Sequence, residues 1–179
     1  MHLLHRLLTT TALAIAWPAA AASLPNRPTP SLDLHRYAGQ WHEIARLPMY
    51  FERKCLDAVV ATYTPNPDGT VHVHNTCRTS KGRMSVDGVA RMKDDQPAAL
   101  EVRFAPAWLT WLPMAWADYW VIEVDAGYRW AVIGSPGRKH LWILSRRPTM
   151  DRALFQTLKE HSRQRGYAVD QLIMTAPLD

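Results

Sequence analysis

Short segments in which apolar and polar side chains alternate fill the chain from Trp41 to Arg146. They are residues 41–47, 57–64, 70–76, 84–93, 98–104, 118–124, 128–133 and 140–146. A period of two is typical of extended strands, and turns such as Pro65–Gly69 separate the segments. Consecutive strands with mostly short turns favour an antiparallel meander, and closing it removes exposed edges. The sequence therefore predicts an all-β, eight-stranded antiparallel up-and-down barrel with room for one small ligand.

The period changes to that of a helix beyond Pro148. Met150, Leu154, Leu158 and His161 have the spacing of one helical face, and Gly166 follows the last turn. We expect Thr149 to cap this helix and the helix to pack outside the barrel. Residues 167–174 then read as a short final strand.

The first 22 residues have the pattern of a secretory signal. A basic front precedes the apolar run 7–17 and the small-residue region 19–22. Because the run is too short to span a bilayer, we expect cleavage near Ala22 and export, although a retained anchor stays open. Residues 23–33 form an extended segment, and residues 34–179 form one domain.

The charge of the chain bears on its partners. The formal net charge is +5 at pH 7, but the basic residues form no cluster with a nucleic-acid motif. We therefore expect no nucleic-acid partner. An anionic membrane or lipid head group suits an exported basic protein better.

Two cysteines flank one predicted hairpin. Cys55 and Cys77 have the same parity and lie about equally far from the turn at 65–69, so a cross-strand disulfide is plausible. Such a bond would stabilise the fold by about 3 kcal/mol. A reactive thiol or a metal site is the alternative.

Three motifs carry a family resemblance. Gly39-Gln40-Trp41 opens the first strand, Asp118-Tyr119 begins a late strand, and Leu141–Arg146 precedes Arg147-Pro148-Thr149. Together these motifs resemble the lipocalins, and the run GQWHEIAR with the later FER is similar to the bacterial outer-membrane lipocalins, which are apolipoprotein D-like. The resemblance implies that Arg146 lies over Trp41 and closes the barrel next to Gly39. A cation–π contact of this kind contributes about 2 kcal/mol when desolvated.

The leader departs from the pattern of that family. Bacterial outer-membrane lipocalins often carry a lipidated cysteine at the cleavage point, and residues 1–22 contain none. We therefore expect a soluble periplasmic or secreted protein, with an association with the outer membrane left open.

The cavity is expected to be lined by the inward positions of the barrel. Parity places Trp41, Glu43, Ala45 and Leu47 on one face of the first strand, and a buried Glu43 needs a partner in the wall or on a ligand. Further inward residues of the predicted lining are Val86, Ala90, Met92, Leu100, Val102 and Phe104.

The mouth of the cavity is expected to be both apolar and basic. In a meander the connections alternate ends, so the loops 48–56, 79–83, 105–117 and 135–139 share one end. Trp108, Trp111 and Trp116 would form a lid, enter a membrane interface or pack on the rim. The basic rim residues are Arg53, Lys81 and Arg138. This mouth suits an amphiphile with a phosphate or carboxylate, the alternative being a solvated charged rim.

Other chemistry has weak support in the sequence. His72 and His74 are expected to face solvent, and the chain has no Gly-x-Ser-x-Gly elbow, no phosphate loop and no convincing carboxylate pair. We predict a non-enzymatic carrier without cofactor or metal that transports or stores a fatty acid or lysophospholipid-like lipid in the bacterial cell envelope. By resemblance a homodimer is possible. The alternatives are a lipocalin-fold enzyme of the isomerase or de-epoxidase type, with Cys55 as its thiol, and a haem or pigment carrier.

Overall fold

The computed structural model describes residues 23–93, 96–104 and 116–179. The expected signal sequence and the predicted mouth residues Trp108 and Trp111 lie outside the described residues.

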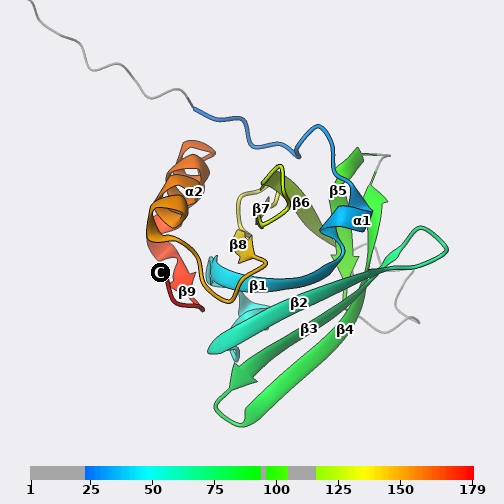
Figure 1. Ribbon diagram of the computed structural model, residues 1–179, viewed down its shortest axis with the longest axis horizontal. Coiled ribbons are helices and arrows are strands. Elements are labelled where there is room, and N and C mark those ends of the chain that lie inside the picture. The colour runs from blue at the N-terminus through cyan, green and yellow to red at the C-terminus, as the bar shows by residue number, and fades with distance from the viewer. Residues whose placement is uncertain (1–22, 94–95, 105–115) are drawn as a thin grey trace, which may run out of the picture.

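A nine-stranded antiparallel sheet closes on itself to form the barrel (Figure 1). Neighbouring strands follow the order β2-β3-β4-β5-β6-β7-β8-β1-β9, and a further pairing of β1 with β2 closes the ring of eight. The predicted eight-stranded up-and-down barrel is confirmed. The elements are α1 (Leu34–Tyr37), β1 (Gly39–Arg46), η1 (Tyr50–Glu52), β2 (Asp57–Pro65), β3 (Val71–Thr79), β4 (Gly82–Lys93), β5 (Gln96–Arg103), β6 (Ala117–Val124), β7 (Trp130–Gly134), β8 (Trp142–Ser145), α2 (Arg152–Gln164), η4 (Val169–Gln171) and β9 (Ile173–Met174).

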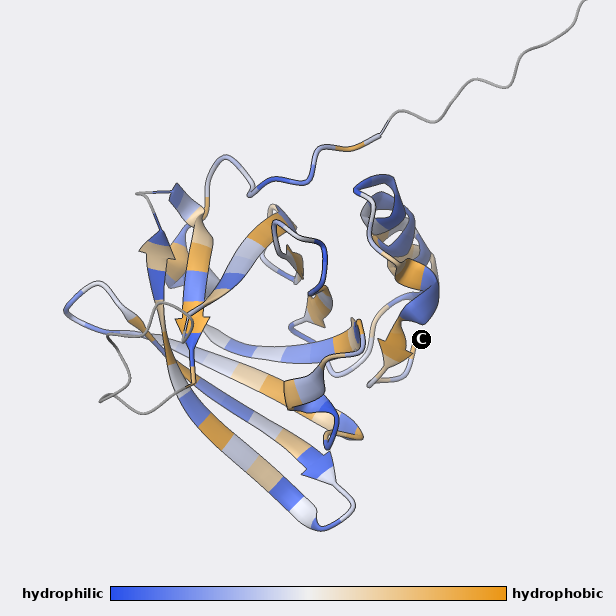
Figure 2. Ribbon diagram, turned by 180° about the vertical axis from the view of Figure 1, so that it is seen from behind, coloured by the Kyte–Doolittle hydropathy of each residue, from blue (hydrophilic) through white to orange (hydrophobic). Residues whose placement is uncertain are grey.

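Apolar and polar residues alternate along the long strands, which places a separate apolar cluster on each side of the sheet (Figure 2). The inner cluster lies inside the barrel and includes Trp41, Val73 and Ile133. The outer cluster lies between the sheet and α2 and includes Leu141, Phe155 and Leu158. The barrel therefore buries its strands on both faces beneath α2 and on the inner face elsewhere.

A bulge in β1 changes which side chains face inward. Glu43 lies opposite Leu144, whereas Ala45 lies opposite Ile143, so two steps along β1 match one step along β8. Ala45 and Leu47, expected to share the inner face with Trp41, instead pack in the outer cluster beneath α2. Arg46, expected on the other face from Glu43, donates a hydrogen bond to it. Strict parity was wrong here because it holds only as far as the bulge.

The helix α2 begins later than expected. Asp151 caps it by accepting a hydrogen bond from Leu154 N, while the Thr149 hydroxyl donates to Asp179. The carboxylate is the stronger cap because it also complements the helix dipole. Of the predicted stripe, Leu158 and Met150 are buried, and His161 lies instead beside Glu123 at 3.0 Å.

The segment after α2 is not the continuous strand that the sequence suggested. It contains η4 and the two-residue β9, which pairs with the end of β1 through Ala45 and Met174. Tyr167 reaches into the barrel wall, where its hydroxyl accepts a hydrogen bond from Ser135 N at 3.0 Å. Gly134 makes room for this hydroxyl, since a Cβ there would lie 2.0 Å from Tyr167 Oη.

A short helix that sequence periodicity did not indicate precedes β1. Asp33 caps α1 by accepting hydrogen bonds from His35 N and Arg36 N. One turn is too short to show a helical period, so the cap was its only signal. In the part of the chain that the structure describes, no helix has the length and apolar character needed to cross a membrane.

Candidate ligand-binding site

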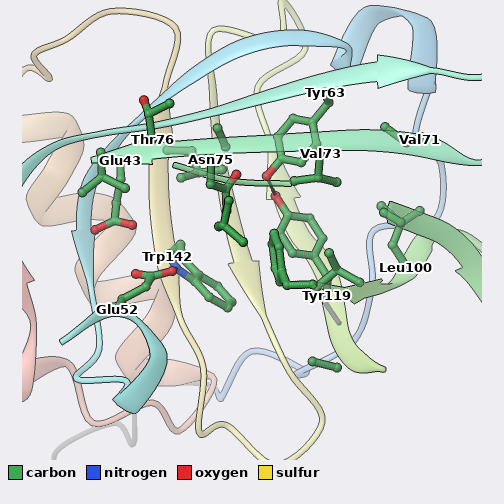
Figure 3. Close-up of a pocket in the computed structure, with 18 of the residues that line it drawn as sticks. Glu43, Glu52, Tyr63, Val71, Val73, Asn75, Thr76, Leu100, Tyr119 and Trp142 are labelled. Carbon is green, nitrogen blue, oxygen red and sulfur yellow. Dashed lines mark hydrogen bonds between the residues drawn. The ribbon is translucent and has the colours of Figure 1, made fainter. Parts of the chain in front are cut away.

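A cavity of about 620 Å³ occupies the interior of the barrel (Figure 3). Much of its wall is apolar and includes Val71, Val73, Leu100 and Leu144. It extends to the surface at the mouth, where Phe104 lines it while remaining 38% exposed. This volume and this lining are typical of a site for a small apolar or amphiphilic ligand.

Trp41 and Arg146 seal the other end. The guanidinium carbon of Arg146 lies 3.9 Å from the centre of the Trp41 ring, and Trp41 Nε1 donates to Tyr37 O at 2.8 Å. Gly39 has a φ of +91°, and a Cβ there would be 3.4 Å from Arg146 Nη1. The Gly-x-Trp motif thus combines a left-handed backbone residue with a ring that the arginine covers.

Three tyrosine hydroxyls are linked deep in the cavity. Tyr119 Oη lies 2.8 Å from both Tyr37 Oη and Tyr63 Oη. Burial raises the pKa of all three phenols above the ordinary value. They therefore stay uncharged, and their hydrogen bonds to one another satisfy polar atoms that would otherwise be costly to bury.

Two glutamates and one arginine form a buried cluster in the cavity wall. Arg46 Nη1 donates to Glu43 Oε1 at 2.7 Å, and Arg46 Nε lies 3.2 Å from Glu52 Oε2. Glu52 Oε1 also accepts from Trp142 Nε1 at 3.2 Å, and the Thr175 hydroxyl lies 3.0 Å from Glu43 Oε1. Elements distant in sequence thus meet here: β1, η1, β8 and the segment after β9.

At neutral pH the cluster of Glu43, Glu52 and Arg46 binds one more proton than the same three side chains would bind if they were isolated in water. Burial raises the pKa of Glu52 to about 8, and the negative charge of Glu43 contributes to that rise. Burial likewise raises the pKa of Glu43, although Arg46 opposes this. One guanidinium cannot compensate two buried carboxylates, so at neutral pH Glu52 carries a proton and the cluster is close to neutral.

The structure brings six of the residues expected in the cavity together. Glu43, Val86, Ala90, Leu100, Val102 and Phe104 all line it. Phe104 packs over β4 because residue 88 is a glycine, where a Cβ would lie 2.6 Å from Phe104 Cδ1. Met92 pairs with Leu100 one residue before the end of β4, is not among the lining residues and is 42% exposed.

Trp116, expected at the mouth, does not line the cavity. Its ring packs under two guanidinium groups, with Arg91 at 4.0 Å and Arg103 at 4.9 Å from its centre. Arg91 pairs with Glu101 across the outer face of β4 and β5. Trp116 therefore belongs to the outside of the wall.

The three basic residues expected at the rim have different surroundings. Arg53 stacks on Tyr50, with its guanidinium carbon 3.9 Å from the ring centre, and both border a small depression beside the mouth. Lys81 is exposed in the turn between β3 and β4. Arg138 turns to the α2 side, where its Nε donates to Arg165 O at 2.6 Å.

The predicted disulfide between Cys55 and Cys77 is present, with 5.5 Å between the Cα atoms. Among the described residues no cysteine is free. Cys55 O accepts a hydrogen bond from Arg46 Nη2 at 3.0 Å. The disulfide therefore also fixes the loop that supports the buried cluster.

His72 and His74 lie on the outer face, as expected. Both rings contact Asp87 Oδ1, at 3.1 and 2.8 Å. No group of three His, Cys, Asp or Glu side chains arranged for a metal ion occurs in the described ranges.

Several residues of the site were not singled out from the sequence. Arg46 was hidden by the bulge, and Glu52 by its place in a loop. Tyr63 had a usable signal, because it shares the inward parity of Val71 and Val73, but its contact with Tyr119 joins residues 56 positions apart.

Comparison with known proteins identifies the family. A family model of the lipocalin-like domain matches residues 32–177. The chain belongs to the lipocalin family. This lipocalin is 39% identical over 151 residues to temperature-induced lipocalin-1 of Arabidopsis thaliana, a match that covers 83% of this chain and 81% of the relative. It is also 35% identical over 170 residues to the outer membrane lipoprotein Blc of Citrobacter freundii, covering 90% and 92% of the two chains.

The fold of this lipocalin also occurs among solved structures. The cockroach allergen Per a 4 superposes with a TM-score of 0.63 over 87% of this chain and 95% of the allergen. The two are only 17% identical, so the likeness concerns the fold alone.

Proposed function

We propose that this lipocalin is a non-catalytic carrier of a single-chain amphiphile, a fatty acid or a lysophospholipid-like lipid, for transport or storage in the bacterial cell envelope. The observation that carries the proposal is the apolar cavity of about 620 Å³, sealed by Trp41 and Arg146 at one end and reaching the surface at the other. A one-ended cavity of this kind suits an acyl tail inserted from the mouth with the head group towards solvent.

The energetics of tail burial are sufficient for useful affinity. Burying about ten methylene groups at about 0.8 kcal/mol each contributes roughly 8 kcal/mol before the cost of association. No chemical step is needed for this function.

The enzyme alternative depended on Cys55 as a free thiol. Cys55 is bonded to Cys77, so this nucleophile is occupied. A binding role without turnover accounts for the described residues with fewer assumptions.

The disulfide also supports export, because such bonds persist in oxidising compartments. We place the protein in the periplasm or outside the cell, and a peripheral contact with a membrane at the mouth would let it exchange lipid. Homodimer formation belongs to the same proposal. Native mass spectrometry of the purified protein measures the oligomeric state directly.

The test combines ligand identification with a blocked cavity. Purified protein is extracted with organic solvent, and the extract is examined by mass spectrometry for acyl lipid. Ala90→Trp would place a large ring in the cavity from a buried lining position. Ala153→Trp, at an exposed position on α2, is the matched control.

We expect acyl lipid from the wild type and from Ala153→Trp, and at least about tenfold less from Ala90→Trp, because the ring would occupy the volume needed by the tail. A folded wild-type protein that carries no lipid and binds no fluorescent fatty acid would refute the carrier. A visible absorption band would instead point to a pigment or haem.

A further inference from the structure

Phenol hydroxyls meet at the closed end of the cavity. The ring centre of Tyr37 lies 5.0 Å from that of Trp41 and 5.5 Å from that of Tyr63. Tyr119 Oη lies 2.8 Å from both Tyr37 Oη and Tyr63 Oη, and all three side chains line the cavity. We call these three residues the tyrosine triad. Because Arg146 covers Trp41, the triad lies beside the seal, at the end opposite to the mouth.

The triad contains more hydrogen-bond donors than its internal contacts can use. Three uncharged phenols carry three O–H protons, and each of the two contacts uses one of them. One O–H proton is therefore left over, whichever way the hydroxyls rotate. The three hydroxyls have no other hydrogen-bond partner in the part of the chain that the structure describes. A buried O–H group without an acceptor is unfavourable, so an acceptor atom on an occupant of the cavity would stabilise the complex.

A second polar side chain beside the triad also lacks a partner. Asn75 on β3 lines the cavity, and its Oδ1 is buried without a hydrogen-bond partner among the described residues. Asn75 pairs with Ala61 on β2, two residues before Tyr63, so Asn75 and Tyr63 are diagonal neighbours in the cavity wall (Figure 3). Side chains in diagonal positions of a sheet are close enough to contact the same bound group. The carboxamide of Asn75 has both an acceptor and donors to offer to such a group.

The surroundings of the triad favour an uncharged acceptor. No lysine or arginine lines the cavity among the described residues, and Arg146 donates its N–H groups to backbone carbonyls just before Trp41. The pKa of each phenol of the triad is raised because burial disfavours the charged phenolate. A carboxylate placed here would likewise lose its hydration without gaining a cation. A keto or hydroxyl oxygen carries no charge and can accept the leftover proton.

We propose that the tyrosine triad, together with Asn75, is a polar anchor at the closed end of the cavity that binds an uncharged oxygen on the buried end of the ligand. The ligand class is an acyl lipid whose chain carries a keto or hydroxyl group near its methyl end. The inference rests on the proposed carrier function and narrows its ligand class. It concerns the tail of the ligand and not its head group.

The test compares acyl chains that differ by one keto oxygen. Stearic acid, 16-oxostearic acid and 6-oxostearic acid compete at pH 7 with the fluorescent probe N-phenyl-1-naphthylamine bound to the protein. The keto oxygen lies near the methyl end in 16-oxostearic acid and nearer the head group in 6-oxostearic acid. The quantity measured is the oxo ratio, which is the concentration of the oxo acid that displaces half of the probe divided by the corresponding concentration of stearic acid.

Removing all three hydroxyls tests the anchor. Replacing only one tyrosine by phenylalanine leaves an O–H proton unpaired, because each change removes contacts together with the proton. Tyr37→Phe, Tyr63→Phe and Tyr119→Phe are therefore combined, which keeps the rings and removes every hydroxyl of the triad. We expect the oxo ratio of 16-oxostearic acid to rise by about tenfold in this triple variant, and that of 6-oxostearic acid by no more than about twofold.

Two further variants complete the comparison. Asn75→Leu removes the unpaired carboxamide and should raise the oxo ratio of 16-oxostearic acid by about threefold. Tyr128→Phe removes a hydroxyl that accepts a hydrogen bond from Asp33 N and is not part of the cavity lining. This control should keep both oxo ratios at their wild-type values. An unchanged ratio in a folded Asn75→Leu would remove Asn75 from the anchor.

An infrared measurement on the wild type needs no variant to fold. The band of the keto carbonyl in bound 16-oxostearic acid, identified by isotope labelling of that carbon, should lie at the lower wavenumber of a hydrogen-bonded carbonyl. In the folded triple variant the same band should move to the position that it has in hexane.

Two results would overturn the anchor while leaving the carrier intact. One is a wild-type carbonyl band already at the position seen in hexane. The other is a triple variant, shown by circular dichroism to be folded, that keeps the wild-type oxo ratio for 16-oxostearic acid. If none of the three acids displaces the probe and no lipid is extracted from the purified protein, the proposed function itself fails.

Discussion

Arg146 covers the ring of Trp41 at 3.9 Å and also ties together the backbone on which that ring is held. Its guanidinium donates to the carbonyls of Arg36, Ala38 and Gln40 at 2.8 to 2.9 Å. One side chain therefore caps α1, supports the left-handed turn at Gly39 and seals the cavity.

Replacing Arg146 should lower the free energy of unfolding. We expect Arg146→Ala to cost about 3 kcal/mol, from the cation–π contact and the unpaired carbonyls, and Arg146→Lys to cost about half of that because lysine cannot bridge several carbonyls. Urea unfolding followed by circular dichroism measures both. Arg147→Ala, at a side chain 78% exposed, should change stability by no more than about 0.5 kcal/mol. Equal losses of unfolding free energy in Arg146→Ala and Arg147→Ala would contradict the stabilising role of the contact between Arg146 and Trp41.

Removing the disulfide should also destabilise the fold. The bond between Cys55 and Cys77 closes a loop with a sequence separation of 22, and Cys55→Ser with Cys77→Ser should lower the free energy of unfolding by about 3 kcal/mol. Urea unfolding with and without reductant tests this. The reductant should destabilise the wild type and leave the double variant unchanged, and a wild type insensitive to full reduction would refute the prediction.

The proton on Glu52 should make stability depend on pH. In the unfolded chain this carboxyl loses its proton near the ordinary glutamate pKa of 4.5, whereas in the fold its pKa is about 8. Between these values folding takes up a proton, so stability is greatest below the lower pKa and falls as pH rises towards 8, by up to about 1.4 kcal/mol per pH unit. Above that the contribution of Glu52 no longer changes.

Urea unfolding at several pH values between 5 and 9 measures this slope. Glu52→Gln should flatten the slope of stability against pH. A smaller slope should remain, because burial also raises the pKa of Glu43, which titrates together with Glu52 as one pair. Glu160→Gln, which makes the same change on the exposed face of α2, should keep the wild-type slope. A Glu52→Gln profile parallel to the wild type would show that the proton resides elsewhere.

The rim beside η1 should bind anionic lipid surfaces. Tyr50, Phe51 and Leu56 are exposed by 77%, 53% and 50%, and Arg53 and Lys54 lie among them. Aromatic rings favour a membrane interface and each basic residue near it contributes about 1 kcal/mol. Arg53→Glu with Lys54→Glu should weaken co-sedimentation with phosphatidylglycerol vesicles by at least about tenfold.

The control for that measurement reverses two charges elsewhere. Arg152→Glu with Lys159→Glu changes the net charge equally on α2, away from the rim. It should reduce binding much less, and the wild-type binding should fall with added salt. An equal loss in both variants would mean that overall charge, and not the rim, governs the contact.

The barrel was predictable because its signals are local. Alternation in residues 41–146 indicates strands wherever pairing is regular, and the hairpin at 65–69 places Cys55 and Cys77 at matching distances from its turn. The contact between Trp41 and Arg146 came from the resemblance, since two residues on strands so far apart in the sequence leave no local trace of their pairing.

The polar part of the cavity was largely unpredictable. A single bulge after Glu43 reverses the side on which Arg46 lies, and no periodicity reveals where a bulge occurs. Glu52 enters the site from η1, a turn whose direction depends on the tertiary packing around it. Arg138 and Trp116 were assigned to the mouth from their loops, but partners on the outer surface determine their orientation.

Thr175 lies where β1 separates from β2. Its backbone N–H donates to Ile44 O at 3.0 Å, next to the short pairing of β9 with β1, while its hydroxyl reaches Glu43. Residues that follow all eight strands of the ring in the chain thus fasten the first of those strands. Until these residues have been made and have docked, that side of β1 lacks its pairing, so a nascent barrel should become able to retain a ligand only after β9 and Thr175 are in place.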